Sequence, residues 1–165
     1  MSINPNQLIE KMAQELRSKV GNELLADAVM IGIHTGGVWI AEQLHRQLNM
    51  SHPLGLLDIN FYRDDFSQGG LHPQVKPSTL PVDLENKTII LVDDVLQSGR
   101  TIRAALNEIF DYGRPERVIL AILVERSGRE LPIQADVVGE QITLQDDEQI
   151  KLTGPEPLEL KVVKR

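Results

Sequence analysis

Residues 88–101 read Thr88-Ile-Ile-Leu-Val-Asp-Asp-Val-Leu-Gln-Ser-Gly-Arg-Thr101, and this stretch decides the fold. The run from Ile89 to Val92 consists of β-branched and leucine residues, which is the pattern of a central parallel strand covered on both faces. Asp93 and Asp94 follow at the expected carboxyl end of that strand, where open α/β sheets bind their ligands. The stretch therefore predicts a buried strand that presents two acids at the edge of a sheet.

The residues after the two acids predict a tight loop that leads into a helix. Backbone N–H groups at such a turn, together with the helix dipole, attract an anion. Two carboxylates just upstream can accept hydrogen bonds from neighbouring hydroxyls, so the combination suits a sugar phosphate. The Walker pattern G-x-x-x-x-G-K-[ST] is absent, which excludes a P-loop of that type. The alternative is an ordinary strand end, with Asp94 as a cap and Gly99 as a turn.

Ile89 to Thr101 resembles the phosphoribosyl pyrophosphate (PRPP) signature of type I phosphoribosyltransferases, which has four apolar residues, two acids, a short variable run and Gly-Arg-Thr. The resemblance implies that Asp93 and Asp94 are the catalytic residues and hold the ribose hydroxyls. It also implies a Mg²⁺ cofactor that PRPP carries, lying near the two acids and not in a side-chain metal site. The PRPP-binding residues would be Val95, Leu96, Gln97, Ser98, Gly99, Arg100 and Thr101.

Composition limits the class of protein. The chain has 165 residues, of which 41% are hydrophobic, and no cysteine, so we expect one domain over residues 1–165 with an adequate core. Disulfides and thiolate metal sites are excluded, and a cytoplasmic protein is expected. No apolar run of signal-peptide or membrane-spanning length occurs. The net charge of −7 argues against broad, non-specific binding of nucleic acid.

Strand and helix patterns alternate along the chain. Asn4 and Pro5 predict the start of a helix that stops at Gly21. The segments 28–33 and 118–124 have the apolar pattern of buried strands, and the segments 38–48 and 102–110 have helical spacing. This alternation predicts an α/β fold, a doubly wound, mainly parallel sheet with helices on both faces. The resemblance adds a small hood.

Between the first strand and its helix lie His34, Thr35, Gly36 and Gly37, where a glycine pair lets backbone N–H groups approach a ligand closely. In type I phosphoribosyltransferases this is the pyrophosphate loop. The string is most similar to Gly-Ile-Lys-Thr-Arg-Gly of the bifunctional pyrimidine operon attenuation regulator and uracil phosphoribosyltransferase (PyrR) family. His34 replaces the lysine and Gly36 the arginine, so we expect that restoring both cations raises activity.

Further strings support the same likeness. The segment 57–62 alternates like a half-buried strand, and Arg63, Asp64 and Asp65 match the family's string after it. Residues 67–83 are rich in glycine and proline and are expected to form a flexible lid, or otherwise an inert linker. Residues 125–133 resemble Asp-Arg-Gly-His-Arg-Glu-Leu-Pro of the family, and the tail 158–163 alternates like an edge strand. The substrate and base pocket would comprise Arg126, Val137, Val138 and Ile150.

The resemblance implies uracil phosphoribosyltransferase activity, in which uracil and PRPP give UMP and diphosphate. It also implies a homodimer or higher homo-oligomer and UMP-responsive binding of pyrimidine leader RNA. Lys11, Arg17, Lys19 and Arg46 are the candidate RNA-binding cations, although they are equally typical of solvated helices. Two alternatives stay open: a weakly catalytic, nucleotide-sensing regulator and a purine (hypoxanthine or guanine) phosphoribosyltransferase. A receiver-like signalling domain is disfavoured, because no later strand ends in the phosphoacceptor aspartate or lysine that it needs.

Overall fold

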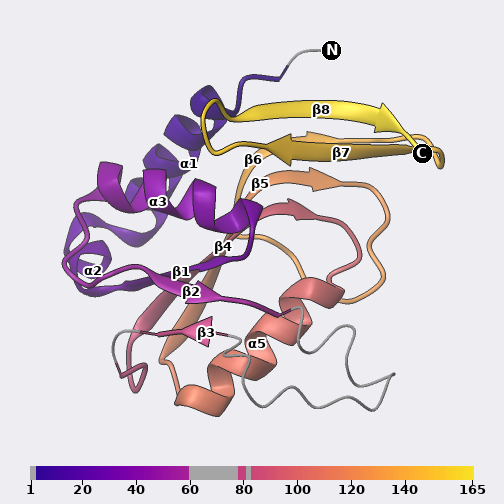
Figure 1. Ribbon diagram of the computed structural model, residues 1–165. Coiled ribbons are helices and arrows are strands. Elements are labelled where there is room, and N and C mark those ends of the chain that lie inside the picture. Colours follow the sequence, from indigo (N-terminus) through magenta and orange to yellow (C-terminus); the bar gives the residue numbers. More distant parts are fainter. Residues whose placement is uncertain (1–2, 60–77, 81–82) are drawn as a thin grey trace.

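The computed structural model describes residues 3–59, 78–80 and 83–165. Its main sheet has six strands in the order β3-β2-β1-β4-β5-β6, and Figure 1 shows this sheet between α-helical layers. The strands are β1 (Val29–Ile33), β2 (Gly55–Leu57), β3 (Ser78–Thr79), β4 (Thr88–Leu96), β5 (Arg117–Arg126) and β6 (Val137–Ile142). All neighbouring pairs are parallel except β2 and β3. The predicted doubly wound, mainly parallel sheet is therefore confirmed.

Strand β4 lies at the centre of the sheet but is longer than the sequence predicted. It pairs with β1 only as far as Val92, whereas its pairing with β5 continues to Leu96. The pairing with β1 stops first because β1 ends at Ile33. From Asp93 onward, β4 therefore has a neighbouring strand only on the β5 side. Asp93 and Asp94 thus lie within the strand, on a side that is open toward the end of β1.

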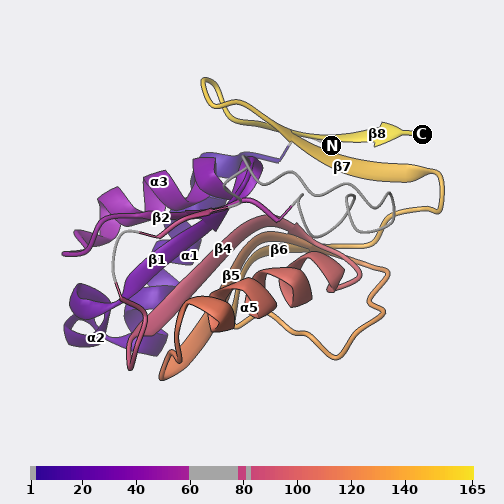
Figure 2. The same cartoon turned by 60° about the horizontal axis from the view of Figure 1, so that its bottom comes forward.

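The helices cover the two faces of the sheet, as Figure 2 shows with α5 on the opposite side from α1 and α3. They are α1 (Pro5–Val20), α2 (Asn22–Asp27), α3 (Gly36–Leu48) and α5 (Arg100–Tyr112). Alternate residues of β4 follow this division: Ile90 and Val92 pack with α1 and α3, whereas Ile89 and Leu91 pack with α5. The continuous apolar runs in the sequence arise because every residue of these strands faces a helix.

Helix boundaries match the sequence signals at some ends and not at others. The Asn4 side chain accepts hydrogen bonds from Asn6 N and Gln7 N, and Pro5 is the first helical residue, so the predicted cap is confirmed. Helix α3 begins at Gly36 and α5 at Arg100, in each case two residues earlier than predicted. The short helix α2 carried no recognised signal.

The chain ends in a hairpin outside the main sheet. Strands β7 (Glu148–Thr153) and β8 (Glu159–Lys164) pair antiparallel, and Ile3 bridges to Leu160. The expected tail strand therefore exists, with β7 as its partner. Strand β2 covers Gly55–Leu57, and residues 60–62 of the strand predicted at 57–62 lie outside the described residues. Strand β3 lies inside the segment expected to be a loop.

Candidate functional site

Asp93 and Asp94 form the centre of the candidate site. Asp93 is 6% exposed, and Asp94 is half-buried. The Asp93 Oδ1 atom accepts a hydrogen bond from Asp94 N at 2.8 Å, and Asp94 Oδ1 accepts one from Val95 N at 2.8 Å. Each carboxylate is thus held by the next backbone N–H, which fixes both side chains at the open side of β4.

The glycine pair at the start of α3 packs directly on these two acids. A Cβ atom on Gly36 would lie 2.8 Å from Asp94 Cγ, and one on Gly37 would lie 2.7 Å from the Val92 carbonyl oxygen. Real Cβ atoms do not approach other atoms that closely, so Gly37, which faces backbone atoms, requires glycine, whereas a side chain at position 36 would displace the Asp94 carboxylate. The structure therefore brings the predicted pyrophosphate loop and the predicted ribose-binding acids into contact. His34 and Thr35 are exposed beside them.

The predicted phosphate loop connects β4 to α5. Only Gln97, Ser98 and Gly99 lie between the two elements, and Gly99 has a φ of 96°, which favours glycine. The Ser98 hydroxyl accepts a hydrogen bond from Arg100 N at 3.1 Å. The first N–H groups of a helix have no partner within the helix, so the start of α5 offers donors to an anion.

Val95 and Leu96 belong to the strand instead of the loop. Val95 packs against the core beneath α1 and α3, and Leu96 lies in the core beneath α5. Of these two predicted PRPP-binding residues, Val95 is half-buried, whereas Leu96 lines the cavity beside the loop.

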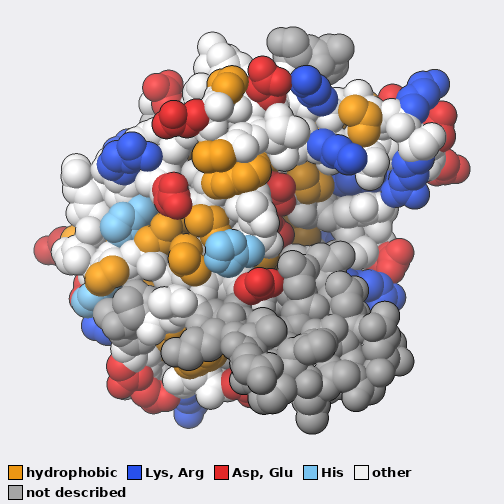
Figure 3. Space-filling view, viewed as in Figure 1, with side chains coloured by type: hydrophobic (Ala, Val, Ile, Leu, Met, Phe, Trp, Pro, Cys, Tyr) orange, Lys and Arg blue, Asp and Glu red, His pale blue; other side chains and the backbone are white. Residues whose placement is uncertain are grey.

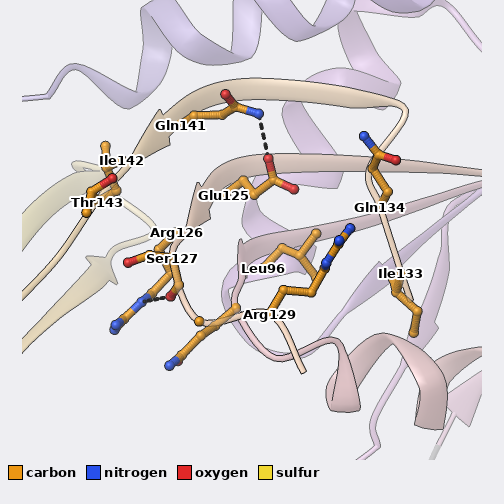
Figure 4. A pocket seen from close by; sticks show the side chains of 12 residues that line it. Leu96, Glu125, Arg126, Ser127, Arg129, Ile133, Gln134, Gln141, Ile142 and Thr143 are labelled. Carbon is orange, nitrogen blue, oxygen red and sulfur yellow. Dashed lines mark hydrogen bonds between the residues drawn. The ribbon is translucent and has the colours of Figure 1, made fainter. Parts of the chain in front are cut away.

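A cavity of about 340 Å³ opens at the carboxyl ends of β4, β5 and β6. Its lining includes Leu96, Gln97, Glu125, Arg126, Arg129 and Gln141. Glu125 and Gln141 lie opposite each other on β5 and β6, and Gln141 Nε2 donates a hydrogen bond to Glu125 Oε2 at 2.7 Å (Figure 4). The cavity thus combines an apolar floor with amides, a carboxylate and arginines, which suits a flat, polar ligand.

Comparison with known proteins agrees with this geometry. The sequence profile of the family described as "Phosphoribosyl transferase domain" matches residues 2–157. The chain belongs to the phosphoribosyltransferase family. It is 57% identical over 164 residues to "Bifunctional protein PyrR" of Nitrosococcus oceani, covering 98% of this chain and 93% of that protein. It is 54% identical to the protein of the same name in Pseudomonas aeruginosa, covering 96% and 93%. Within the phosphoribosyltransferases, the chain therefore belongs to the PyrR group.

Solved structures show the same fold at low identity. A hypoxanthine-guanine phosphoribosyltransferase from Bacillus anthracis has a TM-score of 0.69 and 20% identity, covering 98% of this chain and 96% of that one. A hypoxanthine phosphoribosyltransferase from Staphylococcus aureus has a TM-score of 0.66 and 18% identity, covering 91% and 80%. The predicted family, the phosphoribosyltransferase fold and the class of enzyme are confirmed.

The predicted base-pocket residues of this phosphoribosyltransferase lie in different surroundings. Val137 and Ile150 are buried in the core with α1, because β6 and β7 turn these side chains inward, and neither lines the cavity. Val138 lies in a separate hollow between α1 and β6. Arg126 does line the cavity, but its guanidinium donates to the Ser127 and Glu148 carbonyl oxygens. Glu125 and Gln141, which line the cavity, were not among the predicted residues; Glu125 directly follows the predicted strand 118–124, whereas no strand was predicted around Gln141.

Several other expectations concern the rest of the chain. Arg63, Asp64 and Asp65, and most of the lid at 67–83, lie outside the described residues. Among the residues that are described, no three or more His, Cys, Asp or Glu side chains form a group able to hold a metal ion. No helix in the described ranges has the length and apolar character to cross a membrane.

Proposed function

We propose that this phosphoribosyltransferase joins uracil to PRPP and produces UMP and diphosphate. The observation that carries the proposal is the contact between the glycine pair of α3 and the acids of β4, which supports assigning a pyrophosphate loop beside ribose-binding carboxylates. The phosphate loop follows on the same strand. PRPP has a diphosphate, a ribose and a 5′-phosphate, in that order along the molecule. The glycine pair, the two acids and the phosphate loop follow each other in the same order.

Each part of the site has a chemical task in this reaction. The loop from Gln97 to Gly99 and the start of α5 would hold the 5′-phosphate by backbone N–H groups. Asp93 and Asp94 would accept hydrogen bonds from the ribose hydroxyls and stabilise positive charge that develops on the ribose as the diphosphate leaves. The backbone at Gly36 and Gly37, at the start of α3, would bind the diphosphate. Catalysis then rests on positioning and charge, without a covalent nucleophile.

The donor set fits Mg²⁺ bound together with PRPP. Mg²⁺ prefers one or two carboxylates plus substrate phosphate oxygens, and Asp93 and Asp94 are adjacent carboxylates beside the proposed diphosphate position. When bound, the ion would neutralise charge on the leaving diphosphate. Asp94, the more exposed of the two acids, is the side chain that we assign to it.

The base would enter the cavity between the ends of β5 and β6. Glu125 and Gln141 supply hydrogen-bonding atoms at its wall, and Leu96 supplies apolar surface. Uracil has ring N–H donors and carbonyl acceptors, so it can bond to both a carboxylate and an amide. Support for uracil over a purine also comes from the PyrR relatives, because the purine enzymes are similar only at the level of the fold.

One assay tests the reaction and the base together. Nucleotide formation from PRPP is measured with uracil, hypoxanthine, guanine and orotate side by side, at the same concentration of Mg²⁺. We expect UMP to form fastest by at least tenfold. Faster formation of IMP or GMP would assign a purine enzyme, and the absence of turnover with PRPP still bound would favour the nucleotide-sensing regulator.

A second role in binding pyrimidine leader RNA is proposed because the PyrR relatives are named bifunctional. Three candidate cations of α1 already donate to backbone carbonyls: Lys11 to Gly139 at 2.9 Å, Arg17 to Gln47 at 2.8 Å and Lys19 to Asp136 at 2.5 Å. A carbonyl does not neutralise a cation, so the charges remain available to phosphate. On the face shown in Figure 3, basic side chains are interspersed with acidic ones, which disfavours non-specific binding.

RNA binding is tested by titrating the protein against its own pyrimidine leader RNA at about 50 and about 200 mM salt, with and without UMP. We expect binding that is salt-sensitive, specific and strengthened by UMP. Equal affinity for a scrambled RNA, with no effect of UMP, would leave the chain as an enzyme alone.

A further inference from the structure

The phosphate loop, Gln97 to Gly99, is held from outside by the segment 127–133, which follows β5. The Ser98 carbonyl oxygen accepts hydrogen bonds from Glu130 N and Leu131 N, both at 3.0 Å. Gly99 packs against the same segment, since a Cβ atom on it would lie 3.3 Å from Leu131 Cβ. The conformation of the loop therefore depends on residues that are about thirty positions away in the chain.

Glu130 adds a side-chain contact to this support. Its Oε1 atom accepts a hydrogen bond from Arg100 Nε at 2.8 Å, and the two side chains are 55% and 66% exposed. An ion pair with that exposure has little effect on overall stability. Glu130 nevertheless makes contacts on both sides of Gly99: its backbone N–H reaches Ser98 in the loop, and its carboxylate reaches Arg100 at the start of α5.

The supporting segment is fixed at both ends. Near its start, Ser127 N donates to the Ile142 carbonyl at 3.2 Å, and the Ser127 hydroxyl accepts from Leu144 N at 3.2 Å. Beyond its end, Asp136 N donates to the Leu120 carbonyl at 2.9 Å, and Asp136 Oδ2 accepts from Leu120 N at 2.9 Å. A segment that is anchored on both sides can transmit a fixed position to the loop.

The hydrogen bonds to Ser98 also orient a donor. In a trans peptide the carbonyl and the following N–H point in opposite directions. Since the Ser98 carbonyl points toward Glu130 and Leu131, the Gly99 N–H of the same peptide points away from the segment. That direction makes the N–H available to an anion bound on the other side of the loop.

We propose that Glu130 is a positioning residue for PRPP, which holds the phosphate loop in its binding conformation without touching the substrate. This inference rests on the proposed function, because it assigns the loop to the 5′-phosphate. It predicts an effect on PRPP binding and none on the fold. Ser127 and Arg129 of the same segment line the cavity. The contacts of Glu130 therefore also link the cavity to the proposed phosphate loop.

The test compares Glu130→Ala with a control, Glu159→Ala. The control removes a similarly exposed ion pair away from the site, between Glu159 and Lys161 on β8. We expect Glu130→Ala to raise the KM for PRPP about two- to fivefold, as for the loss of one exposed charge-assisted contact. Its kcat, its KM for uracil and its Tm should match the wild type, and Glu159→Ala should change none of these. In Arg100→Ala, adding Glu130→Ala should have no further effect, because the two residues act as a pair.

The outcomes separate this inference from the proposed function. An active wild type whose KM for PRPP is unchanged in Glu130→Ala would overturn the positioning role alone. A lower Tm in Glu130→Ala with proportional loss of kcat would show a structural role instead. If the wild type forms no nucleotide with any base, the proposed function fails. PRPP affinity measured by calorimetry for the same variants then decides on Glu130 without turnover.

Discussion

Gly36 and Asp94 are packed so closely that a Cβ atom on Gly36 would lie 2.8 Å from Asp94 Cγ. Only the end of the Asp94 side chain can move to make room, since the backbone on both sides belongs to regular structure. The glycine and the position of the carboxylate therefore depend on each other. This relationship links the proposed diphosphate and ribose subsites, and it leads to the first prediction.

The variant Gly36→Ala should lower kcat/KM while the fold is retained, because the methyl group forces the Asp94 carboxylate out of its position. Losing one charge-assisted contact to the ribose corresponds to about 1.5 to 3 kcal/mol, or roughly tenfold or more in kcat/KM. Gly113→Ala is the control, because Gly113 has an extended φ of 163° and ends α5 away from the site. Equal kcat/KM in both variants would refute the coupling.

The sequence led us to expect that restoring both cations of the relatives raises activity, but the close packing of Gly36 on Asp94 predicts opposite effects at the two positions. His34 is exposed, so His34→Lys places an ammonium group near the leaving diphosphate and should raise kcat by Coulomb attraction. Gly36→Arg introduces the same clash with Asp94 as alanine does and should cancel that gain. Steady-state rates at several Mg²⁺ concentrations check this, and a double variant that is faster than His34→Lys alone would contradict it.

Asp93→Asn and Asp94→Asn should each reduce kcat/KM by about tenfold or more, the equivalent of one lost charge-assisted contact. Asparagine keeps an oxygen that can accept the hydrogen bond from the next backbone N–H, so circular dichroism and Tm should change little. Rates close to wild type in both variants would show that these carboxylates do not bind the ribose.

Asn4→Ala should affect stability and leave the chemistry unchanged. The Asn4 side chain caps α1 with two hydrogen bonds, and loss of such a cap costs about 1 kcal/mol of unfolding free energy. Urea denaturation measures this loss, and kcat should equal that of the wild type. Asn6→Ala, at the second position of the same helix, is the control and should cost less.

The central strand, the acids and the phosphate loop could be predicted from the sequence because they are contiguous, so a single run of residues carries the pattern. The end of β4 could not be predicted. It depends on where β1 stops and where β5 continues, and these are pairings between distant segments.

The lining of the proposed base cavity was predicted less well, because its walls come from different strands. Val137 resembles a base-binding residue in sequence, but the burial of its side chain beneath α1 depends on how that helix packs on β6. Glu125 and Gln141 become neighbours only through the register of β5 and β6. The contact of Glu130 with the phosphate loop is likewise set by tertiary structure, and no local pattern announces it.

The most direct test of the account is a ³¹P NMR time course of the protein with PRPP and Mg²⁺, with and without uracil. We predict that uracil causes the PRPP signals to be replaced by those of UMP and free diphosphate in equal amounts, and that this is slowed in Asp94→Asn. PRPP that stays intact with uracil, or diphosphate that is released at the same rate without uracil, would contradict the proposed transfer to uracil.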